Sequence, residues 1–191
     1  MSSEPGTGHE GNLTNLASND RITQIRALLE GVDIAKEFDH LKAQGLGALR
    51  KLLNDRGGVS QKERATALVL GFEFAAKLQH ALHDELLDTD GETEVARVKH
   101  AIVNALDGLD SGRANLSELL DHPDTGVRAS AGAYLTNLMP ERVIPILRAI
   151  EVKEEGLSAD FTAHWVLLDW ELKQKAAAKD GPAAGAKTST E

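Results

Sequence analysis

LLDHPDTGVRASAGA, residues 119–133, is the stretch that decides the fold. Its two leucines suit the end of one helix, and His122 and Pro123 interrupt that helix. Asp124 then stands where a carboxylate can cap the next helix, along which apolar residues recur at helical spacing from Val127 onward. Alanines and a glycine keep this second helix thin, so that another helix can approach it closely. The stretch predicts a helix, a tight turn and an antiparallel helix.

The order of residues in this stretch resembles a HEAT-like repeat, in which a leucine pair, an Asp-Pro-Asp type of turn, Val-Arg and small residues follow one another. The matching residues are Leu119, Leu120, Pro123, Asp124, Val127, Arg128 and Ala131. The sequence departs from the repeat at His122, which occupies the place of the usual turn aspartate, although Asp121 precedes it. In HEAT-like units the arginine commonly bonds within the turn or to its neighbour, so the resemblance implies a structural role for Arg128.

A wider part of the chain, from about residue 70 to residue 170, resembles the bacterial domain-of-unknown-function 2019 family. The pieces that carry this resemblance, besides residues 119–131, are Pro140, Glu141, Arg142, Leu147, Ile150, Trp170 and Glu171. Members of that family are small, have no known catalytic motif and are often encoded beside polymorphic toxins. The resemblance therefore implies a HEAT-like helical fold and an immunity role.

The composition favours an all-α protein, because 191 residues suit one domain with tails and only 4% of them are aromatic. The chain has no cysteine, which excludes disulfides and thiolate metal sites. Its formal net charge is −9 without a compensating basic cluster, so we expect no nucleic-acid partner. An acidic protein attracts basic proteins over long range, which speeds their encounter. The same charge also suits ordinary solubility.

The first residues, MSSEPGTGHEGN, contain no basic residue before an apolar core, unlike a secretory signal. No apolar run approaches the ~20 residues that span a bilayer. We therefore expect a cytoplasmic protein that has no membrane segment.

Helical periodicity divides the chain into seven or eight helices with short links and no convincing strand. The expected fold is a short irregular α-solenoid or bundle with HEAT-like hairpins. The expected parts are a disordered tail at residues 1–17, a helical extension at 18–58, a HEAT-like domain at 59–178 and a disordered tail at 179–191.

The longest predicted helix covers residues 60–87 and begins with a capping box of Ser60 and Glu63. Pro140 suits the first turn of a later helix, whereas Pro145 either kinks that helix or delays its regular part. The last helix is predicted to begin at Ser158. The residues expected on its buried face are Phe161, Trp165, Leu168 and Leu172.

His80, His83 and Asp84 are the nearest approach to a metal-binding cluster. A zincin-type helix needs two histidines four residues apart with a glutamate beside the first, and here the spacing is three. His80 falls on the predicted solvent-facing side of its helix, so we expect surface histidines and no metal. Because the chain also lacks a phosphate loop with its lysine and a Gly-x-Ser-x-Gly element, we expect no cofactor and no enzyme activity.

Acidic residues and one tryptophan are the candidates for binding a partner. Carboxylates gather at the start of a helix because its exposed amides favour them, and the same cluster can form a docking patch for a basic protein. Trp165 lies on the predicted apolar face and is expected in the core, whereas Trp170 lies off it, at an interface or against a neighbouring helix. The candidate residues are Asp84, Asp88, Asp90, Glu92, Glu94 and Trp170.

These observations lead to one hypothesis and two alternatives. The hypothesis is a cytoplasmic immunity protein that binds a cognate, basic antibacterial toxin and occludes its active site. One alternative is a HEAT-like adaptor for cellular proteins. The other is a helical-repeat enzyme of the DNA-glycosylase kind, which would need a basic concave face and a catalytic carboxylate.

Overall fold

The computed structural model describes residues 60–83, 89–153 and 157–180, together with Gly47, Arg50, Lys51, Leu53 and Asn54. Within these ranges the chain forms six helices and no strand, which confirms the all-α class. They are α3 (Gln61–Ala81), α4 (Thr89–Asp107), η2 (Gly112–Asp121), α5 (Thr125–Leu135), α6 (Pro140–Lys153) and α7 (Leu157–Asp180). The predicted tail at 1–17 and nearly all of the predicted extension at 18–58 lie outside the described residues.

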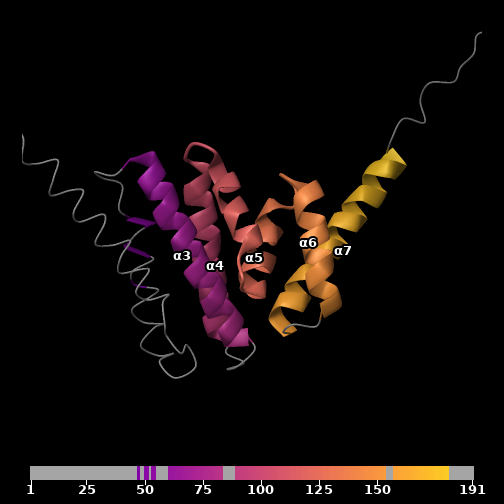
Figure 1. The fold of residues 1–191 in the computed structure, drawn as a ribbon, viewed down its shortest axis with the longest axis horizontal. Helices are drawn as coiled ribbons and strands as arrows, with labels where there is room; N and C mark the ends of the chain where they lie inside the picture. Colours follow the sequence, from indigo (N-terminus) through magenta and orange to yellow (C-terminus); the bar gives the residue numbers. More distant parts are fainter. Residues whose placement is uncertain are drawn as a thin grey trace, which may run out of the picture.

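The helices pack as a bundle in which α5 lies in the middle. It contacts η2, α6, α7 and α3, while α3 packs with α4 and α6 packs with α7. Figure 1 shows α3 and α7 towards opposite sides of the molecule, converging at one end, with α5 between them. The core is shared by all six helices, and its largest fully buried side chains include Phe72, Ile102 and Leu147.

The predicted capping box at the start of α3 is confirmed. Ser60 Oγ accepts a hydrogen bond from the Glu63 amide at 3.2 Å, and the Glu63 carboxylate accepts one from the Ser60 amide at 2.9 Å. The hydrogen bonds from Ser60 also lower the pKa of Glu63. The helix is shorter than the predicted 60–87 segment, because regular α-helix ends at Ala81 and residues 84–88 lie outside the described chain. Predicted core residues Leu68, Phe72, Ala75, Leu78 and Leu82 are buried.

The turn that sequence analysis singled out forms as predicted. Asp124 caps α5, because its carboxylate accepts a hydrogen bond from the Val127 amide at 2.9 Å. The Arg128 guanidinium donates to the carbonyl oxygens of His122 and Pro123 at 2.7 and 2.8 Å. The contacts of Arg128 are therefore within the turn, in agreement with the structural role expected for it.

His122 lies in the turn before α5 and makes hydrogen bonds on both sides of its ring. Its Nδ1 accepts a hydrogen bond from the Asp124 amide at 3.0 Å, as a turn aspartate would do. Its Nε2 lies 3.1 Å from the Glu73 carboxylate on α3, and that carboxylate also accepts from Lys77 at 2.7 Å. The imidazole thus closes the turn and ties it to α3.

Two glycines of α5 allow its neighbours to approach closely. A Cβ added at Gly126 would lie 2.6 Å from Cδ2 of His80, and one at Gly132 would lie 2.9 Å from Cδ2 of Leu147. The ring of His80 packs under Gly126 and is half-buried, so the predicted solvent-facing position of His80 was wrong. The spacing along α3 could not show that a glycine of α5 would leave room for this ring.

The structure decides between the two alternatives left open for Pro145. α6 begins at Pro140, and Pro145 lies inside it, so the proline does not delay the regular part of the helix. Its neighbours Val143, Ile144 and Leu147 are buried against the rest of the core, which holds this segment helical despite the missing amide.

We predict that replacing Gly132 with valine destabilises the protein. Val143 and Leu147 are fully buried beside Gly132, so the added methyl groups would force α5 and α6 apart. The expected loss is about 1–3 kcal/mol in the free energy of unfolding, measured by urea denaturation. The matched control is Gly108→Val at an exposed turn, where a Cβ meets only ordinary contact; it should change stability by less than about 0.5 kcal/mol. Equal losses in both variants would contradict the close-approach argument.

Candidate functional site

The last helix presents apolar side chains on two faces. Its inner face packs on α5 and α6 through Ala159, Ala163 and Leu167, which are buried, and through the partly buried Val166 and Trp170. Its outer face carries four large apolar residues that remain exposed. Their exposed fractions are 57% for Phe161, 52% for Trp165, 37% for Leu168 and 56% for Leu172.

These exposures overturn the predicted orientation of α7. Trp165 and the three residues on its face were expected in the core, and they lie outside. Trp170 was expected at an interface or against a neighbouring helix, and it packs partly against the core, in agreement with the second alternative. The physical reason is that α7 packs on both α5 and α6, and the alanines at 159 and 163 allow these helices to approach its first half closely. Helical spacing alone does not distinguish this small-residue face from the bulkier one.

The structure separates the predicted acidic cluster at the start of α4. Asp90 is exposed. Glu92 turns towards α3, where its carboxylate oxygens lie 3.5 Å from Gln79 Nε2 and 3.3 Å from His83 Nδ1. Glu94 forms an ion pair with Arg50. The other two candidates, Asp84 and Asp88, lie outside the described residues.

A surface hollow of about 540 Å³ brings two of these candidates together. Asp90 and Glu94 lie one turn apart on α4 and both line the hollow, as do Arg50 and Arg97. The remaining lining residues are Leu53, Thr93, Val98 and Ala101. The hollow is therefore lined by apolar side chains and by charges of both signs. The two acids were predicted as candidates from the sequence. Arg97 could also have been placed beside them, because it follows Glu94 by three residues on the same helix, whereas nothing in the local pattern indicated Arg50.

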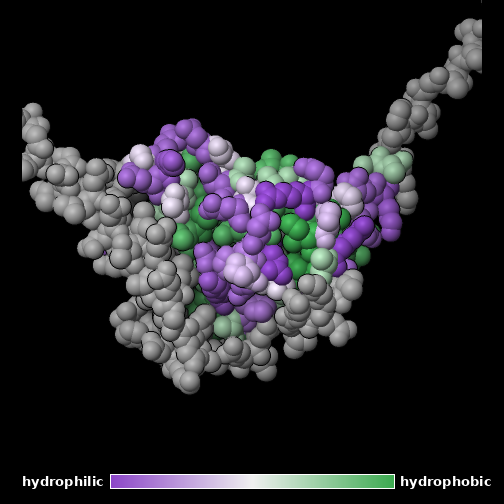
Figure 2. Space-filling model, in the orientation of Figure 1, coloured by the Kyte–Doolittle hydropathy of each residue, from purple (hydrophilic) through white to green (hydrophobic). Residues whose placement is uncertain are grey.

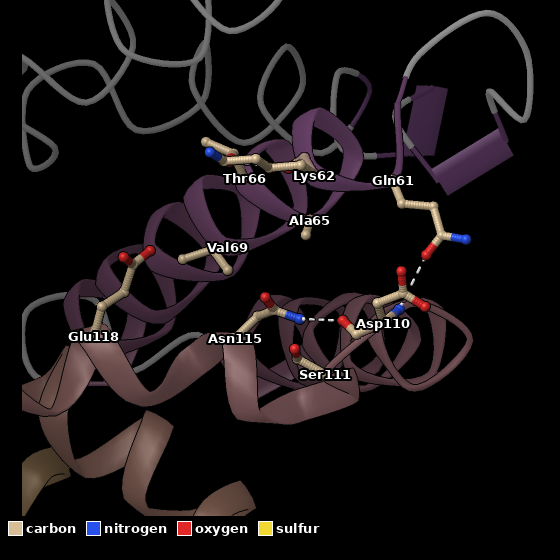
Figure 3. A pocket seen from close by; sticks show the side chains of 9 residues that line it. All are labelled: Gln61, Lys62, Ala65, Thr66, Val69, Asp110, Ser111, Asn115 and Glu118. Atoms are coloured by element: carbon tan, nitrogen blue, oxygen red, sulfur yellow. Dashed lines mark hydrogen bonds between the residues drawn. The ribbon is translucent and has the colours of Figure 1, made fainter.

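A second hollow, of about 300 Å³, lies between α3 and the turn before η2 (Figure 3). Its wall is held by two hydrogen bonds drawn in Figure 3: Gln61 accepts from the Asp110 amide at 3.1 Å, and Asn115 donates to the Asp110 carbonyl at 3.1 Å. Ser111 has a left-handed backbone, with φ of 67°. The lining side chains Lys62, Thr66 and Glu118 make this hollow polar.

Lys99 is a charged side chain inside the core, 7% exposed. Its ammonium group donates to Ser130 Oγ at 3.0 Å and lies 5.8 Å from the centre of the Phe72 ring. Burial lowers the pKa of Lys99 to about 8, and the charge of Glu92 opposes this shift. The contacts join α4 to α5 and α3. The spacing from Val95 to Lys99 to Ile102 follows the buried face of α4, so this position could have been recognised from the sequence.

Among the residues that the structure describes, no group of three or more histidine, aspartate and glutamate side chains could hold a metal ion. Within the same part of the chain, no helix combines the length and the apolar character needed to cross a membrane. Figure 2 shows apolar surface over the middle of one face, where α5 and α6 lie, interrupted by hydrophilic side chains.

Comparison of the chain with protein-family models, with curated proteins and with solved structures finds no match.

We predict that Lys99 makes stability depend on pH. Below about pH 8 the lysine is charged in both states, so the folded protein carries the full cost of a buried charge. Between about pH 8 and 10.5 the folded protein has released the proton and the unfolded chain retains it, so stability rises with pH. We expect a rise on the order of 1–2 kcal/mol from pH 8 to 9.5 in urea denaturation.

The variant Lys99→Met keeps an unbranched apolar stem without the charge. We therefore expect that the stability of this variant does not increase between pH 8 and 9.5. Lys175→Met, at an exposed position of α7, is the matched control and should keep the rise. If the rise persists in Lys99→Met, another group causes it.

Proposed function

We propose that this chain is an immunity protein, which binds a cognate antibacterial toxin and neutralises it by covering the toxin's active site. The observation that carries the proposal is the hollow on α4, which is lined by the exposed Asp90 and the half-buried Glu94 together with apolar side chains. The net charge of −9 and the resemblance to a family encoded beside toxins support the same function.

The hollow suits a basic side chain of a partner. The pair between Glu94 and Arg50 is exposed, with 37% and 58% of the two side chains accessible, so it contributes at most about 1 kcal/mol to stability. A guanidinium or ammonium group from a partner can replace Arg50 at little cost. It would then share the hollow with the two acids Asp90 and Glu94 and with one remaining cation, Arg97. The aliphatic stem of the entering residue would contact Leu53, Val98 and Ala101.

Occlusion requires a rigid surface that meets its target quickly. The buried core of the six helices provides the rigidity, so little conformational entropy is lost on binding. The acidic charge accelerates association with a basic protein. We further propose that the consecutive packed pairs α3–α4, η2–α5 and α6–α7 are HEAT-like hairpins in a short irregular α-solenoid, and that the protein acts in the cytoplasm.

The alternative function is a HEAT-like adaptor that joins cellular proteins. The outer face of α7 favours it, because exposed aromatic residues often anchor protein interfaces. A pull-down from the native cells distinguishes the two functions: an adaptor recovers housekeeping proteins, whereas an immunity protein recovers its toxin.

We predict that Glu94→Lys impairs protection against the toxin encoded by the neighbouring gene. The reversed charge repels a basic group at the hollow, so the dissociation constant of the complex, measured by calorimetry, should rise about tenfold or more. Glu141→Lys makes the same change of charge at an exposed position of α6, away from the hollow, and should retain protection on co-expression. Failure of the wild-type protein to co-purify with that toxin or to suppress its toxicity would refute the immunity function.

A further inference from the structure

The outer face of α7 is a narrow apolar seam with regular spacing. Phe161, Trp165, Leu168 and Leu172 follow one another at intervals of four, three and four residues, which is the spacing of the core positions of a coiled coil. Phe161 and Trp165 contact each other edge-to-face, with ring centres 5.9 Å apart. The inner face of α7 is already packed. Phe161 also stacks on His83 of its own chain, with ring centres 6.2 Å apart, but the four seam residues remain partly exposed, so a second helix can cover them.

We propose that the seam is a homodimer interface, in which α7 packs antiparallel against α7 of a second copy of this chain. This interface is separate from the hollow on α4, and the inference does not depend on the proposed immunity function. None of the residues that line the hollow on α4 belongs to the seam.

The seam is complementary to itself in the antiparallel direction. A two-fold axis midway between Trp165 and Leu168 places Phe161 opposite Leu172 of the second copy, and Trp165 opposite Leu168. Every opposed pair then joins one aromatic ring to one leucine, so the successive layers of the interface have similar volumes. A parallel pair would instead stack tryptophan on tryptophan and leave the leucine layers thin. The antiparallel pair also opposes the two helix dipoles favourably.

The charges beside the seam agree with this arrangement. His164 and Glu171 lie on the same flank of the seam, and the two-fold axis brings His164 of each copy near Glu171 of the other. Each of these two side chains already has a polar contact within its own chain. His164 Nδ1 lies 2.8 Å from the Glu151 carboxylate, and the Glu171 carboxylate lies 3.7 Å from Arg148. Across the two-fold axis, each imidazole can exchange its contact with Glu151 for a hydrogen bond to the Glu171 carboxylate of the other copy, and two such polar contacts border the apolar layers.

The size of the seam indicates a weak dimer. Four partly exposed apolar side chains provide roughly 400 Å² per copy, against about 800 Å² per partner in a standard stable interface. Polar residues beside the seam supply part of the remaining buried area. We therefore expect a dissociation constant in the micromolar range, so that the dimer forms at high concentration and separates on dilution.

Sedimentation velocity over a range of concentrations tests the proposal on the full chain. The wild type should shift from monomer to dimer as its concentration rises, and Trp165→Lys should remain monomeric with an unchanged melting temperature, because residue 165 is exposed. Leu138→Lys replaces an exposed leucine outside the seam, 54% accessible, and should still dimerise. A wild type that stays monomeric at high concentration, or a Trp165→Lys variant that dimerises normally, would overturn the proposal.

Cross-linking tests the antiparallel direction, and the absence of native cysteine makes it specific. The two copies of residue 168 lie roughly 4–5 Å apart along the helix axis in the proposed register, and those of residue 172 lie roughly 16 Å apart. A short bismaleimide should therefore link Leu168→Cys to itself and leave Leu172→Cys unlinked. Equal linking at both positions would indicate a parallel pair and contradict the proposal.

Discussion

The thinness of α5 is the constraint on which the rest of the bundle depends. This helix contacts η2, α6, α7 and α3, and at Gly126 and Gly132 there is no space for even one additional carbon atom. Each neighbour occupies the space thus left: the ring of His80 from α3, and the side chain of Leu147 from α6. Since protein interiors are close-packed, the separation of these helices is determined by the small residues of α5.

The same constraint explains the orientation of α7. A helix that packs against two closely spaced neighbours needs a slender face, and Ala159 and Ala163 provide one. The aromatic residues Phe161 and Trp165 are consequently directed outward, although burial of such large apolar groups is favourable in itself. Their exposure is thus a consequence of core packing, and it leaves α7 with a second apolar face that another protein surface can cover.

Polar residues connect the helices at a few defined points. His122 closes the turn before α5 and contacts Glu73 on α3, while Lys99 extends from α4 to Ser130 on α5. Burial of the Lys99 ammonium is costly, as its lowered pKa shows, and one hydrogen bond and the Phe72 ring offset that cost in part. Glu92 is likewise directed at Gln79 and His83, so an acid that looked like part of a docking patch also has a structural role.

Local features of this protein were determined by the sequence itself, because they depend on neighbouring residues. The capping box at Ser60, the cap at Asp124 and the buried face of α3 all involve residues at most a few turns apart. The acids Asp90 and Glu94 could also be found, since carboxylates one helical turn apart share a face.

Only the tertiary structure decided which side of α7 faces inward, where His80 lies, and which acids remain exposed. Each of these outcomes depends on a distant partner: the width of α5, the space beside Gly126, or the position of Arg50 relative to Glu94. Periodicity shows that a helix has an apolar face, but the shape of the neighbouring helices selects the face that is buried.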